Sequence, residues 1–184
     1  MIRTARLVLR RIEAGDLDAA AALNGDAEVM RYFPEALDRA GSDAHAARML
    51  AHHEAHGWGV WAVVLPEGGL VGMVGPKYAT PDLPCAPAVE VAWRIARPYW
   101  GRGYATEAAR AAIGERFAAG LDAVVALTAA VNAPSRAVME RLGMTRDPAD
   151  DFDHPGVADT SPLRRHVLYR LHRSAWAGER ADAI

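Results

Sequence analysis

The feature that most constrains this chain is a strand, a loop with two glycines and a helix, which follow one another directly. The run 89–95 has the apolar, β-branched character of a buried strand, and Pro98 ends it. Gly101 and Gly103 lie in the loop, and an alanine-rich helix begins at about Tyr104. Glycine lacks the Cβ that would hold a ligand off the backbone, so successive N–H groups can surround an anion at the positive end of the helix. The segment therefore predicts a pyrophosphate cradle.

Three kinds of phosphate-binding loop compete for this segment. A P-loop requires a Lys-Ser/Thr pair after its last glycine, and Tyr104-Ala105 stands there, which excludes it. A dinucleotide-binding loop requires a third small residue, where Thr106 stands. It also requires an acid at the end of the next strand, whereas Asp122 lies at the start of one. The dinucleotide interpretation is the weaker one and stays open beside the third, which rests on a resemblance.

The hexapeptide Trp100-Gly101-Arg102-Gly103-Tyr104-Ala105 resembles the acyl-CoA loop of the GNAT N-acetyltransferase superfamily, written R/Q-x-x-G-x-G/A. Gly103 and Ala105 fill its two small positions. Trp100 stands where the general motif has Arg or Gln, and it resembles the branch of the ribosomal-protein alanine acetyltransferases (RimJ/RimL-like). Further matches to that branch run in order from about residue 5 to 173, over residues 6–10, 26–32, 90–95, 132–135, 142–144 and 166–169.

The order of elements, strands first and then strand–helix–strand–helix, favours an α/β or mixed α+β layered architecture. The resemblance implies the GNAT fold, a mixed sheet of six or seven strands with flanking helices, in which the fourth and fifth strands splay apart. It implies acetyl-CoA as co-substrate, with pantetheine on the backbone of the fourth strand. The residues that the resemblance assigns to this co-substrate are Val91, Trp93, Ile95, Trp100, Gly101, Arg102, Gly103, Tyr104, Ala105, Thr106 and Asn132.

Composition and length fit a single domain over 1–184. The resemblance implies that this is an N-acetyltransferase domain with its core at about 5–173, and we expect a frayed tail at 174–184. The net charge of −2 gives no electrostatic attraction for nucleic acid or an anionic membrane. No apolar run approaches the length of a membrane span, and the first residues lack the apolar stretch of a signal peptide. The single cysteine, Cys85, fits a reducing compartment. We therefore expect a cytoplasmic protein without nucleic-acid or membrane partners.

Amide formation sets the chemistry that the site must perform. An amine with a pKa of about 8 (N-terminal) to about 10.4 (lysine-like) is protonated at neutral pH and has no lone pair to attack with. Glu90, beside the expected splay, is our candidate for the base that removes this proton, directly or through water. A solvated or ion-paired strand carboxylate is the alternative. Period-two alternation places Glu90, Ala92 and Arg94 on one face of the strand.

A second candidate catalytic residue follows the fifth strand. The resemblance places Ser135 near the thioester sulfur and Asn132 on the pantetheine, although both residues also suit the start of a helix as capping groups. Many GNAT enzymes protonate the thiolate with a tyrosine in this helix, and none lies between Pro134 and Met144. Cys85 lies in a proline-rich loop without a matching histidine motif, which disfavours a covalent route.

Several local features have structural interpretations. Ser42 is expected to cap a helix that runs to His56. His45, His52 and His56 share a helical face, which we interpret as solvated because their spacing matches no known metal motif, and we expect no metal. Two strands around a turn at 66–69 predict a hairpin, and Trp58 and Trp61 beside it are assigned to the core, with an acceptor contact left open. Residues 32–34 lie in the region that shapes the acceptor pocket in similar proteins.

Two functions remain. The first is transfer of an acetyl group to a primary amine, either a protein N-terminus or a small molecule, by direct attack in a ternary complex. The second is a non-catalytic acyl-CoA sensor or scaffold. Residues 33–57 and the loop 80–87 are expected to select the acceptor, and neither carries a readable motif. A homodimer is left open.

Overall fold

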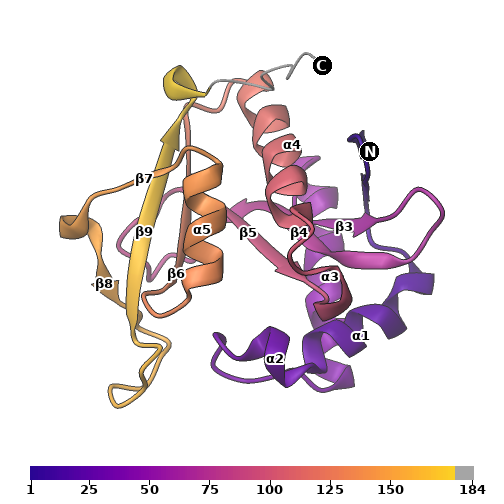
Figure 1. The fold of residues 1–184 in the computed structure, drawn as a ribbon, viewed down its shortest axis with the longest axis horizontal. Coiled ribbons are helices and arrows are strands. Elements are labelled where there is room, and N and C mark those ends of the chain that lie inside the picture. Colours follow the sequence, from indigo (N-terminus) through magenta and orange to yellow (C-terminus); the bar gives the residue numbers. More distant parts are fainter. Residues whose placement is uncertain (177–184) are drawn as a thin grey trace.

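A computed structural model describes residues 1–176 as a central sheet with helices on both faces (Figure 1). Within these residues there are nine strands, and every neighbouring pair is antiparallel except β5 with β6. The order across the sheet is β1-β2-β3-β4-β5-β6-β9-β7, and β8 pairs with β9. The strands are β1 (Ile2–Arg3), β2 (Val8–Arg10), β3 (Trp61–Val64), β4 (Leu70–Tyr78), β5 (Val89–Ile95), β6 (Ala123–Ala129), β7 (Thr145–Arg146), β8 (Phe152–Asp153) and β9 (Arg165–His172).

The sheet matches the expected GNAT fold, with more strands than expected. The three additional strands, β1, β7 and β8, contain two residues each, which is too short for a sequence pattern to reveal. β5 and β6 correspond to the expected fourth and fifth strands. They pair through one register position, Glu90 with Val125, and the rest of β5 has no partner on that side (Figure 1). The expected splay is therefore present.

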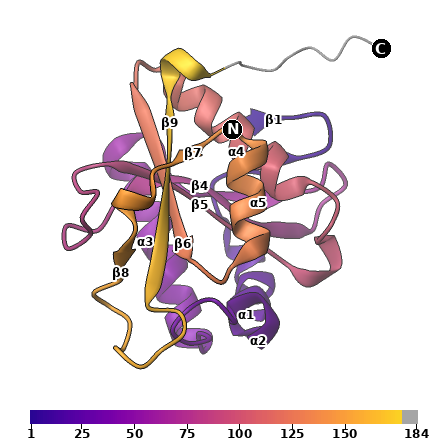
Figure 2. The same ribbon diagram turned by 60° about the vertical axis from the view of Figure 1, so that its left-hand side comes forward.

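The helices cover both faces of the sheet. They are α1 (Leu17–Gly25), α2 (Ala27–Met30), α3 (Arg39–His56), α4 (Tyr104–Ala118) and α5 (Ala133–Arg141). α4 packs on β4 and β5, and α5 lies beside it against β6 (Figures 1 and 2). α4 buries Ala108, Ala112 and Ile113, which recur at helical spacing, over the main core. α1 and α3 cover Ala62 and Met73 on the opposite face.

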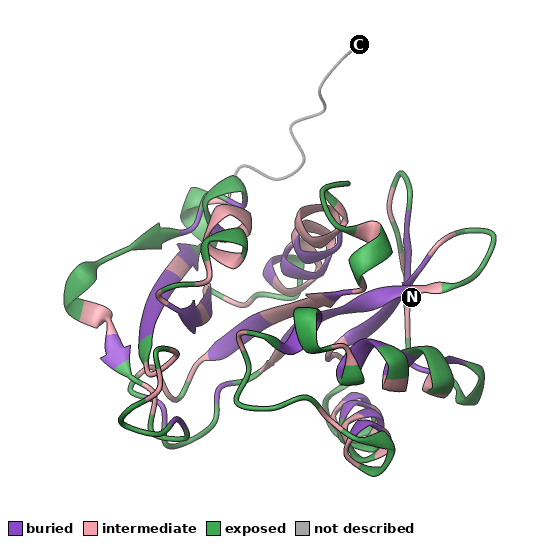
Figure 3. Ribbon diagram, turned by 60° about the horizontal axis from the view of Figure 1, so that its bottom comes forward, coloured by how far each residue is buried: buried purple, intermediate pink, exposed green. Residues whose placement is uncertain are grey.

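Burial follows this layering. The strands are largely buried, while each helix turns one buried stripe toward the sheet and an exposed one outward (Figure 3). A third cluster, with Val125, Phe152 and Leu168, lies between the β6–β9 half of the sheet and the loop after β4. No helix within residues 1–176 combines the length and apolar character needed to cross a membrane.

The expectation that Ser42 caps α3 was wrong. The helix begins one turn earlier, where Asp38 Oδ1 accepts the Gly41 N–H at 2.7 Å. Ser42 is buried inside the helix, and its hydroxyl oxygen accepts the Asn24 Nδ2–H at 2.9 Å. Either residue type can cap a helix, so only the packing of α1 against α3 decides which one does.

The segment 174–184, which we expect to fray, is only partly described. Residues 177–184 lie outside the described part of the chain. Arg173–Ala175 form a single 3-10 turn, and the Trp176 ring packs edge-on against Phe117 with 5.6 Å between ring centroids. The ordered packing therefore extends past the core limit of about 173 that we expected.

Candidate active site

A cavity of about 1300 Å³ occupies the space where β5 and β6 diverge. Its walls come from β5, the glycine loop with the start of α4, the start of α5, the segment after α2, and the loops beside β8 and β9. Twelve of the thirteen site residues expected from the sequence line it, namely Glu90, Val91, Trp93, Ile95, Trp100, Gly101, Gly103, Tyr104, Ala105, Thr106, Asn132 and Ser135. Arg102 does not line it, and its guanidinium lies over the Tyr99 ring, 5.9 Å from the ring centroid.

The glycine loop has the geometry of an anion cradle. Gly101 and Gly103 adopt positive φ angles of 73° and 79°, a region that residues with a Cβ rarely occupy. Gly103 is the N-cap of α4, and no side chain among residues 1–176 caps this helix end. The first N–H groups of α4 are consequently left for an external acceptor, and the helix dipole favours an anion there. This arrangement fits the pyrophosphate of acetyl-CoA.

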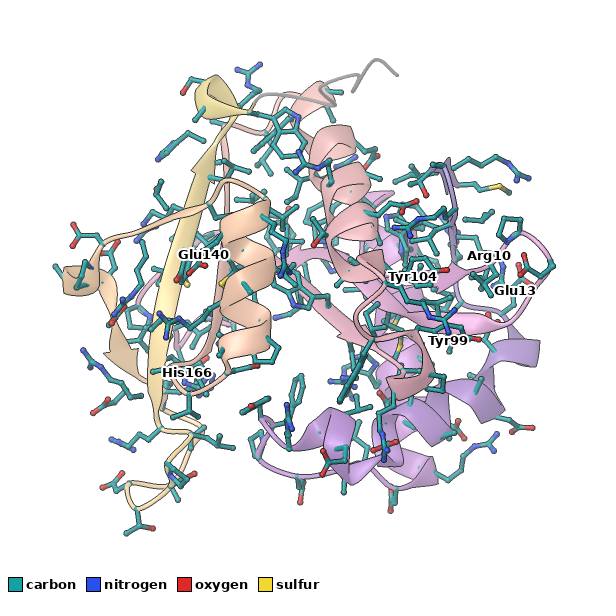
Figure 4. The ribbon with its side chains drawn as sticks, in the orientation of Figure 1. Arg10, Glu13, Tyr99, Tyr104, Glu140 and His166 are labelled. Atoms are coloured by element: carbon teal, nitrogen blue, oxygen red, sulfur yellow. The ribbon has the colours of Figure 1, made fainter. Side chains whose placement is uncertain are left out.

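Two side chains hold the loop against the rest of the fold. Trp100 Nε1–H donates to the Ile95 carbonyl at 2.6 Å, which fixes the start of the loop to the end of β5. Glu107, in the first turn of α4, accepts from Thr4 Oγ1 at 2.6 Å and from Arg6 Nε at 2.7 Å. Burial raises the pKa of Glu107, but the hydrogen bonds from Thr4 and Arg6 outweigh burial and lower the pKa overall. Arg6 also stacks over Tyr104, which lies with Tyr99 where the loop meets α4 (Figure 4).

The cavity-side edge of β5 carries free backbone groups. The Ala96 N–H donates to Val71 O in β4, so alternation directs the backbone groups of Val91, Trp93 and Ile95 toward β6 and the cavity. Within residues 1–176, β6 pairs with β5 only at Glu90, and this parallel pairing engages the neighbouring Val91 N–H. The rest of this edge is left for an extended ligand. The Ile95 carbonyl on this edge is not free for a ligand, because it accepts the Trp100 indole N–H.

Glu90 lies at the point where the two strands separate. Its side chain is 9% exposed, and Lys77 Nζ on β4 donates to its Oε2 at 2.6 Å. The alternation expected for β5 agrees with the packing, since Val91 and Ile95 join the main core while Glu90 faces Lys77. Glu90 Oε1 makes no hydrogen bond within residues 1–176 and belongs to the cavity wall.

Asn132 and Ser135 form the opposite wall. Asn132 Oδ1 accepts the Ser135 backbone N–H at 3.3 Å, and Asn132 Nδ2–H donates to Thr128 Oγ1 at 2.9 Å. Asn132 is therefore the N-cap of α5, as its capping preference indicates. The Ser135 hydroxyl makes no hydrogen bond within residues 1–176 and lines the cavity. Cys85 lies outside the cavity wall, and burial followed by the charge of Glu90 raises the pKa of its thiol.

The sequence analysis missed a histidine at the far end of the cavity. His166 pairs in register with Ala129, at the end of β6, and its ring lies 4.7 Å from the His154 ring (Figure 4). His166 Nδ1 lies 3.2 Å from Arg164 O, a geometry that assigns the hydrogen to Nδ1 and the lone pair to Nε2. Burial lowers the pKa of His166, outweighing the hydrogen bond to Arg164. The only sequence signal for His166 is that it begins the stretch 166–169, which resembles the last strand of the RimJ/RimL-like branch.

The solvated histidine face expected on α3 was wrong. His45 is half-buried in the cavity wall, and burial, reinforced by Arg94, Arg48 and Lys77, lowers its pKa to about 4. His52 is half-buried beside Trp58, with 4.7 Å between ring centroids, and only His56 is exposed. Trp58, after the helix, and Tyr78 on β4 cover the His52 ring, and helical spacing alone gives no sign of either.

The tryptophans and the acceptor segment can also be placed. Trp61 is 6% exposed in the main core, as expected. Trp58 packs against the His52 and Tyr78 rings and is not part of the cavity wall. Residues 32–34 do line the cavity, on the side of α2.

This arrangement of loop, helix and splayed strands was compared with known proteins. Residues 6–145 match the acetyltransferase (GNAT) domain family. The chain belongs to the GNAT acetyltransferases. An FsC-acetyl coenzyme A-N(2)-transacetylase from Aspergillus fumigatus is 30% identical over 95% of this chain and 77% of its own length. The N-acetyltransferase YnaD of Bacillus subtilis is also 30% identical, over 79% of this chain and 83% of its own length.

Solved structures of this family share the fold. A GNAT acetyltransferase from Bacillus anthracis superposes with a TM-score of 0.78 at 24% identity, over 94% of this chain and 98% of that chain. YncA from Salmonella typhimurium, solved with acetyl-CoA, gives 0.70 at 18% identity, over 91% and 94%. RimL, a ribosomal L7/L12 α-N-protein acetyltransferase solved with coenzyme A, gives 0.74 at 13% identity, over 94% and 97%. This GNAT chain is an acetyltransferase that uses acetyl-CoA.

Proposed function

We propose that this acetyltransferase moves the acetyl group to a primary amine by direct attack in a ternary complex, with Glu90 as the base. The observation that carries the proposal is the place of Glu90. It is a carboxylate with one free oxygen, in the cavity wall, at the residue where β5 and β6 part. The uncapped start of α4 at the other end of β5 supports binding of the co-substrate pyrophosphate.

The side chains divide the proton transfers between them. Acetyl-CoA supplies a thioester carbonyl, which an uncharged amine attacks. Glu90 Oε1 takes the proton from the amine, directly or through a water, while Lys77 holds the other carboxylate oxygen in place. Ser135, whose hydroxyl has no partner within residues 1–176, donates a hydrogen bond to the departing sulfur and passes to it the proton that the attacking nitrogen loses, so the serine ends unchanged. α5 contains no tyrosine that could take this role.

The acceptor is a primary amine, either a protein N-terminus or a small molecule. Trp100 and the residues after it support a RimJ/RimL-like enzyme, and in this chain the tryptophan ties the loop to β5. The relative from Aspergillus fumigatus is named for acetylation at an N(2) nitrogen, in keeping with an amine acceptor. The cytoplasmic location, the homodimer, the single domain over 1–184 and the absence of a metal stay predictions.

The test measures free thiol released from acetyl-CoA in the presence of a panel of amines, with mass spectrometry of the product. We expect thiol release that requires an amine and yields its acetylated form. Binding of acetyl-CoA without thiol release on any amine would instead support the alternative of a non-catalytic acyl-CoA sensor.

A further inference from the structure

One charged group in the cavity wall has no role in the chemistry proposed above. Arg94 lies on β5 and reaches the wall from the same face of the strand as Glu90. Its guanidinium is half-buried, and Nη1–H donates to Asn24 Oδ1. Within residues 1–176 no carboxylate forms an ion pair with Arg94, and its buried Nε has no hydrogen-bond partner. Burial lowers the pKa of Arg94 to about 10, so the group remains a cation at neutral pH.

Two other half-buried cations, Arg10 and Lys77, do have acid partners. Arg10 on β2 donates to both oxygens of Asp16, at 2.6 and 2.9 Å. Lys77 pairs with Glu90 at 2.6 Å. Removing a guanidinium from water without a compensating anion is unfavourable, and Arg94, unlike Arg10 and Lys77, lines the cavity without a carboxylate partner among residues 1–176. The difference points to an anion that arrives with a ligand.

Buried polar groups from two helices hold Arg94 in this position. Asn24 on α1 is fully buried, and its Nδ2–H donates to Ser42 Oγ on α3 at 2.9 Å. That bond fixes the orientation of the Asn24 amide, so its oxygen faces the guanidinium. On another side the Phe33 ring covers the guanidinium, with 4.4 Å from Cζ to the ring centroid. Three segments therefore fix the direction of one unpaired cation.

We propose that Arg94 binds a carboxylate of the acceptor, so that the acceptor is a primary amine of amino-acid size that carries a carboxylate. A guanidinium presents a planar set of N–H donors that matches the two oxygens of a carboxylate. At about 3.3 Å per strand residue, the Cα atoms of Glu90 and Arg94 are about 13 Å apart. Ala92 lies between them on the same face and also lines the cavity, and its small side chain leaves room for a small amino acid. The inference rests on the function proposed above and names its substrate class.

The first experiment compares matched acceptors with the full-length protein. Thiol release is measured for free amino acids, for the primary amides of the same amino acids, and for short peptides with an acidic or a neutral second residue. We expect kcat/KM for the free acid to exceed that for its amide about ten- to a hundredfold, the range of a hydrogen-bonded charge. Equal rates for acid and amide, or a preference for the peptides with an acidic second residue over free amino acids, would overturn the proposal.

The second experiment places the missing acid inside the protein. Asn24→Asp keeps the size of the side chain and gives Arg94 an internal carboxylate, while the Ser42 hydroxyl can donate in place of accepting. We expect the acid-to-amide ratio to fall to about one, with a thermal midpoint no lower than that of the parent. Arg94→Met should likewise lower the acid-to-amide ratio to about one. Arg31→Met removes a cavity-wall arginine that already pairs with Glu28, so the ratio should stay at the parent value.

A purely structural Arg94 would give a different result. Its replacement would then lower the thermal midpoint and reduce acid and amide turnover equally, leaving their ratio unchanged. A binding measurement separates this proposal from the function on which it rests. Calorimetric titration of a free N-acetyl amino acid and of its amide into the CoA-saturated protein should show a preference for the acid that Asn24→Asp removes, whether or not the enzyme turns over. Equal binding of the two would overturn the proposal.

Discussion

The two halves of the cavity are built from different parts of the chain. The half that we propose for acetyl-CoA is largely backbone from one continuous stretch, the end of β5, two glycines with positive φ and the uncapped start of α4. The half that we propose for the acceptor, called the acceptor half below, consists of side chains, with Lys77, Glu90, Arg94, His45 and His166 contributed by three strands and a helix. A backbone cradle suits a part of the substrate that never changes, whereas ionisable side chains can be exchanged to suit a particular amine. The predictions below test this division.

The largest effect should come from the acceptor half. Glu90→Gln keeps the shape of the side chain but cannot accept a proton. We expect kcat/KM to fall by about two to four orders of magnitude with little change in acetyl-CoA affinity. The loss should shrink as pH rises, because more of the amine is already uncharged. Steady-state rates from pH 6 to about 10 check this.

Glu140→Gln is the matched control for Glu90. Glu140 lies on α5 outside the cavity, where its Oε1 accepts the Tyr169 hydroxyl (Figure 4). Its replacement should leave the rate within a few-fold. Near-normal turnover of Glu90→Gln at neutral pH would exclude Glu90 as the base and leave a route through water or His166.

The next effect belongs to the co-substrate half. Acetyl-CoA at a hundredfold excess over its dissociation constant should stabilise the fold by about 2.7 kcal/mol, which a thermal shift detects. Gly103→Val should remove this shift, since a β-branched residue cannot keep a φ of 79° without moving the loop N–H groups, and a Cβ there would lie 3.5 Å from Arg6 Nη2. Gly120→Val, at φ 96° beyond the end of α4, imposes the same kind of backbone strain outside the cavity. It should lower the midpoint and keep the shift. An undiminished shift in Gly103→Val would contradict our assignment of the cradle.

A smaller effect concerns the pH dependence of stability in the acceptor half. The pKa of His45 is about 4 in the folded protein, against about 6.5 in the unfolded chain. Between these values the unfolded state binds more protons, so stability is retained above pH 6.5 and lost as pH falls toward 4. Allowing for the partial exposure of the ring, His45→Gln should reduce this loss by about 2 kcal/mol. Urea unfolding at several pH values measures it, and an unchanged pH profile would contradict the burial argument.

The smallest effect should come from Ser135, at the border between the halves. Ser135→Ala removes a weak donor to a thiolate that already leaves readily, so we expect a loss of about tenfold or less. This loss should not shrink with rising pH as the loss in Glu90→Gln does. Ser161→Ala, outside the cavity, serves as the control. A loss larger than that of Glu90→Gln would make proton return to sulfur the demanding step.

The sequence by itself determined the parts of the protein that depend on neighbours along the chain. β5, the positive φ of Gly103, the start of α4 and the Asn132 cap are each set by local sterics or local hydrogen bonds, and the printed residues are enough to predict them. The alternating faces of β5 follow from the strand period in the same way. The splay between the fourth and fifth strands was expected from the family resemblance alone, because no local sequence pattern predicts it.

The tertiary structure alone decided which side chains meet. Asn24, Ser42 and Arg94 form one hydrogen-bonded group although they lie on α1, α3 and β5, and no periodicity in any one of them indicates the other two. The same holds for Lys77 with Glu90 and for the burial of His45. Ion pairing and desolvation depend on distances through space, and those distances exist only once the helices have packed on the sheet.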